Sequence, residues 1–192
     1  MPAQAFAAEI TGIEITPGFG LITVSGQIVS GDTKRFSAIA SKYPGATVRL
    51  SSPGGELEPA LAIGTLIAAK RFTTSVAPST LCASACALIW LAGSPRIMSA
   101  TSLIVFHASY RLEADGRAVI SRRGIGRTRQ YLARLGLPEA AIAFATQETA
   151  RTPSGEALAP LTPDMARAIG LSLDIQQAPV AGAPFPQRPW KR

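Results

Sequence analysis

The stretch Thr47-Val48-Arg49-Leu50-Ser51-Ser52-Pro53-Gly54-Gly55 joins a short apolar run to a glycine turn. The run from Thr47 to Leu50 is typical of a buried strand. Apolar residues at helical spacing follow the turn from about Leu57 to Ala69. Strand, turn and helix in this order build a parallel sheet covered by helices, so the stretch predicts an α/β fold.

Segments with strand and helix patterns alternate on both sides of this stretch. Those with the alternating or β-branched pattern of strands are 9–15, 21–28, 72–77 and 103–106. Those with a helical pattern are 32–42, with Asp32 as a candidate cap, 84–92, the residues beyond Arg117 with a break at 136–138, and 161–170. We therefore expect a mainly parallel sheet and a helical C-terminal part.

The chain has 192 residues, which is enough for one domain, and we place that domain at residues 9–177. With 47% hydrophobic and 16% charged residues, the composition excludes a disordered chain. Residues 178–192 are rich in proline and basic side chains, and we expect a disordered tail there. The longest nearly unbroken apolar run, Leu81 to Gly93, is shorter than the roughly 20 residues of a membrane-spanning helix.

The first eight residues leave the compartment open. Ala3-Gln4-Ala5 and Ala5-Phe6-Ala7 look like the small-residue end of an export signal, either because the start of the gene is assigned too late or by chance. If a signal peptide precedes residues 1–8, we expect a periplasmic protein, and otherwise a cytoplasmic one.

Two side chains stand where a parallel sheet can bring them together. Ser84 begins an apolar helix within Cys82-Ala83-Ser84-Ala85-Cys86, and His107, the single histidine, ends a strand. The histidine can activate the serine as a nucleophile, and the N–H groups of Gly55 and Ala85 can stabilise an oxyanion. The alternative is a purely structural role for each, with Ser84 as a helix cap.

These residues resemble the proteolytic subunit of the Clp protease and its relatives in the Clp/crotonase superfamily. The resemblance implies a repeated β-β-α fold and a serine endopeptidase, with Ser84 as nucleophile, His107 as general base, and Gly55 and Ala85 as the oxyanion hole. It covers about Ile22 to Ile175 and rests on the motifs Ser52-Pro53-Gly54-Gly55, Ala83-Ser84-Ala85, 88–93, 104–107 and 161–171.

The resemblance also implies partners. The substrate would be an extended peptide or an unfolded protein, the subunits would assemble into a homo-oligomer, and no cofactor is expected. Two alternatives remain open, a non-catalytic binding module that has kept the fold and a crotonase-like acyl-CoA enzyme.

The third member of the catalytic triad is where the sequence departs from the family. The register after Pro138 places the family's aspartate at Thr149, with Glu148 beside it and Glu156 further on. Either glutamate could orient the histidine, Thr149 could do so more weakly, or the enzyme is slow or inactive. A Ser-Lys dyad like that of the signal peptide peptidase A type has less support, because no lysine falls on a segment facing Ser84.

Cys82 and Cys86 flank the serine, as in a group of small bacterial Clp-like proteins with a Cys-x-Ser-x-Cys motif. At this spacing in a regular helix the Cβ atoms lie about 5 to 6 Å apart, too far for a disulfide, so a bridge requires Cys82 outside the helix. We expect a disulfide in an exported protein and two buried thiols in a cytosolic one. We expect no metal site.

The net charge of +7 favours an acidic partner. Six arginines crowd one predicted helix between residues 117 and 134, and they form either a solvated or subunit-docking face, or a site for an acidic partner or an anionic membrane surface. Nucleic acid is disfavoured, because Tyr131 is the only aromatic residue in this stretch. The six are Arg117, Arg122, Arg123, Arg127, Arg129 and Arg134.

Overall fold

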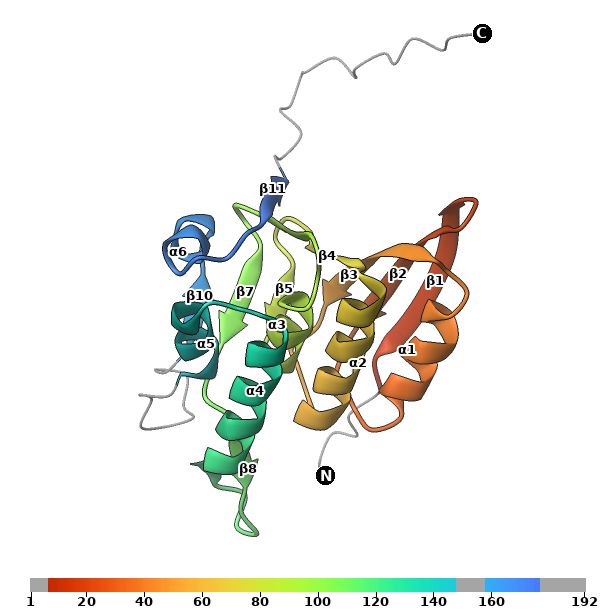
Figure 1. Cartoon of the computed structure of the whole chain (residues 1–192). Coiled ribbons are helices and arrows are strands. Elements are labelled where there is room, and N and C mark those ends of the chain that lie inside the picture. The colour runs from red at the N-terminus through yellow and green to blue at the C-terminus, as the bar shows by residue number, and fades with distance from the viewer. Residues whose placement is uncertain (1–6, 148–157, 177–192) are drawn as a thin grey trace, which may run out of the picture.

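The computed structural model describes residues 7–147 and 158–176, and its largest element is a six-stranded sheet (Figure 1). β1 is antiparallel to β2, and every other neighbouring pair in this sheet is parallel. The prediction of an α/β fold with a mainly parallel sheet is therefore confirmed. In spatial order the strands are β1 (Glu9–Thr16), β2 (Phe19–Ser25), β3 (Gly45–Ser51), β4 (Thr73–Val76), β6 (Arg96–Ser99) and β11 (Asp174–Gln176).

A second sheet has three short strands, β5 (Leu81–Ala83), β7 (Leu103–Phe106) and β10 (Ala159–Leu161). β5 is parallel to β7, and β10 is antiparallel to it. Strands β8 (Tyr110–Leu112) and β9 (Ala118–Ile120) form a separate antiparallel hairpin. The prediction of helix directly after Arg117 is wrong for residues 118–120, because the turn through Gly116, with φ of +82°, returns this segment against β8.

Six helices lie in the described residues. In Figure 1, α1 and α2 stand in front of the six-stranded sheet and α4 lies beside α2, which packs against both α1 and α4. None of the helices in the described ranges has the length and apolar character needed to cross a membrane. The helices are α1 (Asp32–Ala40), α2 (Leu57–Lys70), α3 (Ala85–Trp90), α4 (Arg122–Arg134), α5 (Glu139–Thr146) and α6 (Pro163–Ala168).

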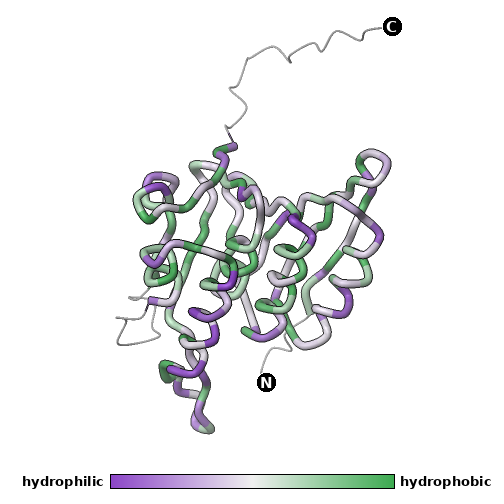
Figure 2. Tube along the Cα trace, viewed as in Figure 1, coloured by the Kyte–Doolittle hydropathy of each residue, from purple (hydrophilic) through white to green (hydrophobic). Residues whose placement is uncertain are grey.

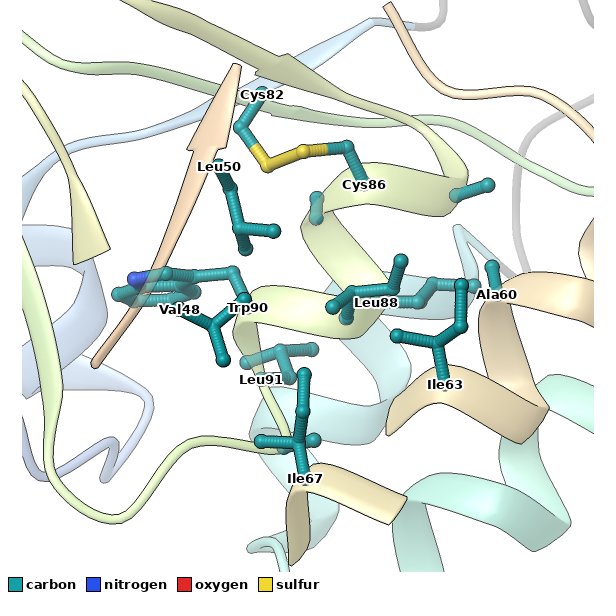
Figure 3. Packing of buried hydrophobic residues seen from close by; sticks show 14 of the residues in the cluster. Val48, Leu50, Ala60, Ile63, Ile67, Cys82, Cys86, Leu88, Trp90 and Leu91 are labelled. Carbon is teal, nitrogen blue, oxygen red and sulfur yellow. A yellow bond between two sulfur atoms is a disulfide. The ribbon is translucent and has the colours of Figure 1, made fainter. Parts of the chain in front are cut away.

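Helix α3 is the centre of the core, and all six of its residues are buried. Figure 3 shows Trp90 beside Val48 of β3 and Leu88 facing Ile63 of α2. The Trp90 Nε1–H donates a hydrogen bond to the Ile97 carbonyl at 3.0 Å, so the one polar group of this buried indole has an acceptor. Since α3 follows Ser84 directly, the close packing of this helix fixes the start of the helix in space.

The described fold begins slightly earlier than the predicted domain. Ala8 is fully buried, and Ala7 forms a bridge with Gln27. Most of the predicted N-terminal segment and the whole of the predicted tail lie outside the described residues.

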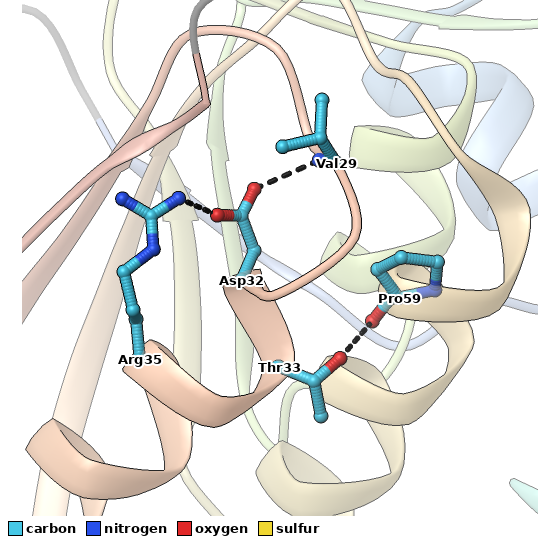
Figure 4. A network of polar contacts seen from close by, with 5 residues as sticks. All are labelled: Val29, Asp32, Thr33, Arg35 and Pro59. Carbon is cyan, nitrogen blue, oxygen red and sulfur yellow. Dashed lines mark hydrogen bonds and ion pairs between the residues drawn. The ribbon is translucent and has the colours of Figure 1, made fainter.

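A buried carboxylate fixes the start of α1 (Figure 4). Gly31, with φ of +96°, occupies the N-cap position, so Asp32 is the first helical residue rather than the cap. The fully buried Asp32 carboxylate accepts a hydrogen bond from the Val29 N–H at 2.8 Å and pairs with Arg35. The loop before α1 is therefore held by a charge-assisted contact.

Candidate active site

Ser84 lies at the sharp turn between β5 and α3. Its φ of +56° and ψ of −122° are rare for a residue with a Cβ. The Ser84 N–H donates a hydrogen bond to the Val105 carbonyl at 2.8 Å, and the Ser84 carbonyl accepts the first bonds of the helix. Although Ser84 occupies the N-cap position, its side chain makes no capping hydrogen bond. The hydroxyl is therefore left free by a strained turn, which is typical of a serine nucleophile on a strand-to-helix elbow.

His107 follows β7, the strand beside the one that delivers Ser84. β5 and β7 are paired in parallel with Ala83 opposite Val105, so the residues that follow the two strands emerge at the same edge. The His107 Nδ1 lies 2.8 Å from the Ala108 carbonyl oxygen. A carbonyl oxygen only accepts, so Nδ1 carries the proton and Nε2 is left as the basic nitrogen.

Ser84 and His107 line one pocket of about 860 Å³, together with Gly55 and Ala85. The Ser84 hydroxyl and the His107 ring make no hydrogen bond to each other within the described residues. The structure thus brings together the four residues that the sequence singled out for nucleophile, base and oxyanion hole.

The glycine turn is attached to the strand that carries Ser84. The Ser52 N–H donates to the Leu81 carbonyl at 2.9 Å, and the Ala83 N–H donates to the Ser52 carbonyl at 3.0 Å. The buried Ser52 hydroxyl accepts the Gly54 N–H at 3.0 Å. The turn and the elbow are therefore held as one unit by backbone hydrogen bonds.

Gly55 can be nothing but glycine at its position. Its φ is +145°, and a Cβ there would lie 2.0 Å from the Ile28 carbonyl oxygen. The Ile28 backbone also holds both neighbours, since its N–H donates to the Gly54 carbonyl and its carbonyl accepts the Glu56 N–H, each at 2.8 Å. This contact aims the glycine turn and connects it to the loop anchored by Asp32.

Two backbone N–H groups at the pocket are unused. Ala85 is the first residue of α3, so its N–H has no acceptor within the helix. The Gly55 N–H takes no part in the bridge to Ile28, and in the described part of the chain neither group donates a hydrogen bond. Both residues line the pocket, so each brings a backbone donor without a described acceptor to the surroundings of Ser84.

The candidates for the third triad member, Glu148, Thr149 and Glu156, all lie outside the described residues. Within residues 7–147 and 158–176, the group that bonds the His107 ring is the Ala108 carbonyl. The pocket lining over the same ranges contains no lysine, and these ranges hold no cluster of three or more metal-ligating side chains.

Cys82 and Cys86 form a disulfide across Ser84, with their Cα atoms 5.2 Å apart. Cys82 belongs to β5 and Cys86 to α3, which satisfies the requirement that Cys82 lie outside the helix. The bridge closes a short loop around the nucleophile, and both residues are fully buried (Figure 3).

The arginine cluster does not share one helix. Arg117 lies in the β8–β9 hairpin, where it pairs with Asp115 at 2.6 Å, and not on α4 as predicted. The prediction failed because residues 118–120 form a strand. On α4, Arg127 pairs with Glu58 and Arg129 with Glu139.

Sequence reasoning missed one wall of the pocket, formed by Tyr110 and Leu112 of the hairpin and by Arg123 and Arg127 of α4. The i, i+4 spacing of the two arginines was the available signal, because it places both on one helix face.

No protein-family model matches the sequence, and no curated protein matches it. Solved structures, however, match the chain. The chain is similar to a serine-to-alanine mutant of the 1510-N membrane-bound stomatin-specific protease, with a TM-score of 0.61 and 18% identity over 81% of this chain and 77% of that one. It is also similar to a lysine-to-alanine mutant of that protease in complex with a substrate peptide, with a TM-score of 0.58 and 18% identity over 81% and 73%. The chain therefore shares its mixed α/β fold, with a mainly parallel sheet, with this protease.

Proposed function

We propose that this chain is a serine peptidase in which Ser84 is the nucleophile and His107 the general base. The observation that carries the proposal is the strained elbow at Ser84, which leaves its hydroxyl free in a pocket shared with His107 and two unused backbone N–H groups. The likeness to proteases, one with a bound substrate peptide, supports it at the level of the fold.

The reaction would proceed through an acyl-enzyme. The Ser84 Oγ attacks the peptide carbonyl carbon while its proton passes to the His107 Nε2, and the Gly55 and Ala85 N–H groups bind the oxyanion. When the intermediate collapses, the C–N bond breaks and Nε2 returns the proton to the leaving amine. Water, activated by the same nitrogen, then attacks the ester and releases the second product with Ser84 restored.

The Ala108 carbonyl supports this role of His107. By accepting the Nδ1 proton it stabilises the tautomer that leaves Nε2 free, which is one task of the aspartate in a Ser-His-Asp triad. A neutral carbonyl stabilises an imidazolium less than a carboxylate does, so a carboxylate from Glu148 or Glu156 would raise the rate, and Thr149 would contribute less.

We propose an extended peptide or an unfolded protein as substrate and a homo-oligomer as the working assembly. The disulfide across Ser84 favours an oxidising compartment such as the periplasm. A non-catalytic binding module is the second candidate, favoured by the missing hydrogen bond between the Ser84 hydroxyl and the His107 ring in the described residues.

Treatment with a fluorophosphonate followed by intact-mass analysis tests the proposal. We expect one adduct on the wild type and none on Ser84→Ala or His107→Ala, because the reagent reacts with an activated serine. Ser37→Ala, which removes an exposed serine of α1, is the matched control and should be labelled as the wild type is. A folded wild type that stays unlabelled with and without reductant would contradict the peptidase and favour the binding module.

A further inference from the structure

The pocket around Ser84 has two walls of opposite charge. The N-terminal end of α2 contributes Glu56 and Glu58, and α4 contributes Arg123 and Arg127. Helices α2 and α4 pack against each other (Figure 1), so the acidic and the basic residues border the same pocket.

One charge on each wall is already neutralised. The Arg127 guanidinium lies 2.6 Å from the Glu58 carboxylate, with 49% and 57% of the two side chains exposed. Arg123 lies one helical turn before Arg127 and also lines the pocket, but no carboxylate among the described residues pairs with it. The lining of the pocket that contains His107 therefore includes a guanidinium that no described carboxylate pairs with.

The position of Arg123 is fixed by the backbone rather than by its own side chain. The Ser121 N–H donates to the Ser109 carbonyl at 2.7 Å, and a Cβ on Gly124 would lie 2.7 Å from the Ser109 Cβ. Ser109 is two residues after His107. The first turn of α4 is thus packed directly on the loop that carries the histidine.

The charge at this helix start opposes helix stability. The positive end of a helix dipole favours acidic residues, but the first turn of α4 has none and contains Arg122 and Arg123. Figure 2 shows hydrophilic residues gathered over the hairpin and the adjoining part of α4. A local arrangement that disfavours the helix is typical of a position retained for binding.

We propose that Arg123 binds a carboxylate of the peptide substrate, so that the site selects acidic peptides. The carboxylate comes from an Asp or Glu side chain or from the peptide C-terminus. A guanidinium can hold either one through two parallel hydrogen bonds. The carboxylate must bind at the α4 wall, because Glu56, next to the oxyanion donor Gly55, repels it at the α2 wall. This inference rests on the proposed function and names its substrate class.

The test measures binding without turnover, using the Ser84→Ala protein and fluorescent peptides. Each peptide carries Glu or Gln at one scanned position, and each is made with a free or an amidated C-terminus. We expect one acidic position, or the free C-terminus, to bind about 10-fold more tightly than its neutral counterpart, the usual effect of a hydrogen-bonded charge pair. Arg123→Gln should remove this preference, and Arg122→Gln, an exposed neighbour outside the pocket lining, should keep it.

The outcomes separate this inference from the proposed function. Equal binding of acidic and neutral peptides, or an acidic preference that survives in Arg123→Gln, overturns the inference even when Ser84 is labelled by a fluorophosphonate. An acidic preference that depends on Arg123 supports it even when Ser84 is inert, and then assigns the site to a binding module. Circular dichroism of Arg123→Gln checks that the variant is folded, as expected for an exposed side chain.

Discussion

Gly54 lies directly against Ser84, so that a Cβ built on Gly54 would come within 2.7 Å of the Ser84 Cβ. The same Cβ would meet the Ala83 carbonyl oxygen at 2.7 Å, and the backbone at Gly54 has φ of +103°. The glycine turn and the nucleophile elbow therefore fit together only when this residue has no side chain.

We expect Gly54→Ala to lower the free energy of unfolding by about 1–3 kcal/mol, the usual cost of a strained backbone position. It should also slow fluorophosphonate labelling of Ser84 by at least about 10-fold, since moving reacting groups apart by about 1 Å already has larger effects. Gly126→Ala is the control, because nothing lies within 4 Å of its Cβ. Labelling of Gly54→Ala at the wild-type rate would show that the contact does not position Ser84.

The disulfide between Cys82 and Cys86 should stabilise the fold. Closing a five-residue loop in the unfolded chain corresponds to about 2 kcal/mol by the loop-entropy relation. We expect Cys82→Ala/Cys86→Ala to unfold at lower urea concentration than the wild type and to be insensitive to reductant. If reductant shifts the midpoint of the double variant as much as that of the wild type, the effect does not come from this bond.

The pair of buried Asp32 and half-exposed Arg35 should contribute more to stability than a fully exposed pair of the same spacing. Removing the Asp32 carboxylate leaves the Val29 N–H without its acceptor, so we expect Asp32→Ala to cost about 2–4 kcal/mol in urea unfolding. The Asp164 side chain, by contrast, is 95% exposed and pairs with Arg167. Asp164→Ala breaks this exposed pair and should cost less than about 1 kcal/mol.

The loop that contains Asp32 also supports the backbone around Gly55. Asp32→Ala should therefore slow fluorophosphonate labelling of Ser84, measured at pH 7.5 without urea. Equal urea midpoints for Asp32→Ala and Asp164→Ala would contradict the stabilising role assigned to the buried Asp32 carboxylate.

Tyr131 predicts an alkaline limit to stability. Burial raises the pKa of the Tyr131 hydroxyl well above its ordinary value of 10.0. Below about pH 10 the residue is neutral in both states, and above it the unfolded chain loses a proton that the folded chain keeps, so the free energy of unfolding falls as the pH rises.

Urea unfolding at pH 8 to 11 checks this dependence. At pH 8 we expect Tyr131→Phe to be less stable by about 0.5–1.5 kcal/mol, because it loses the hydrogen bond to the Leu88 carbonyl at 3.1 Å. Above about pH 10 the free energy of unfolding should fall more steeply for the wild type than for Tyr131→Phe, so the difference between the two proteins shrinks. Tyr110→Phe, which changes a half-exposed tyrosine, should follow the wild type, and parallel curves for all three proteins would rule out Tyr131 as the cause.

The longer elements could be predicted from the sequence because their patterns span several periods. The helix expected at 57–69 is α2 at Leu57–Lys70, and the strand expected at 9–15 is β1 at Glu9–Thr16. Strands of three residues, such as β5 and β9, could not be predicted, since alternation over three positions does not distinguish strand from helix. They form because a partner strand already lies beside them.

The same division holds at the site. Ser84, His107 and Gly55 could be expected to meet, because Gly55 and His107 follow predicted strands and Ser84 begins a predicted helix, positions that lie at one edge of a parallel α/β sheet. The Arg127–Glu58 pair could not, because its members lie on α4 and α2 and meet only through the packing of those helices. The arginine wall of the pocket was therefore interpreted as part of a surface cluster.

The hydrogen bond from the Ser84 N–H to the Val105 carbonyl also bears on how this chain can vary. The separation of nucleophile and base is set by the pairing of two adjacent strands and by the packing of α3, which follows Ser84. The exposed tip of the β8–β9 hairpin, at Ala114, lies beyond both strands, so insertions there would leave this separation intact. Relatives of this protein can differ in length at the hairpin tip, and a reporter peptide can be introduced at that point without disturbing Ser84.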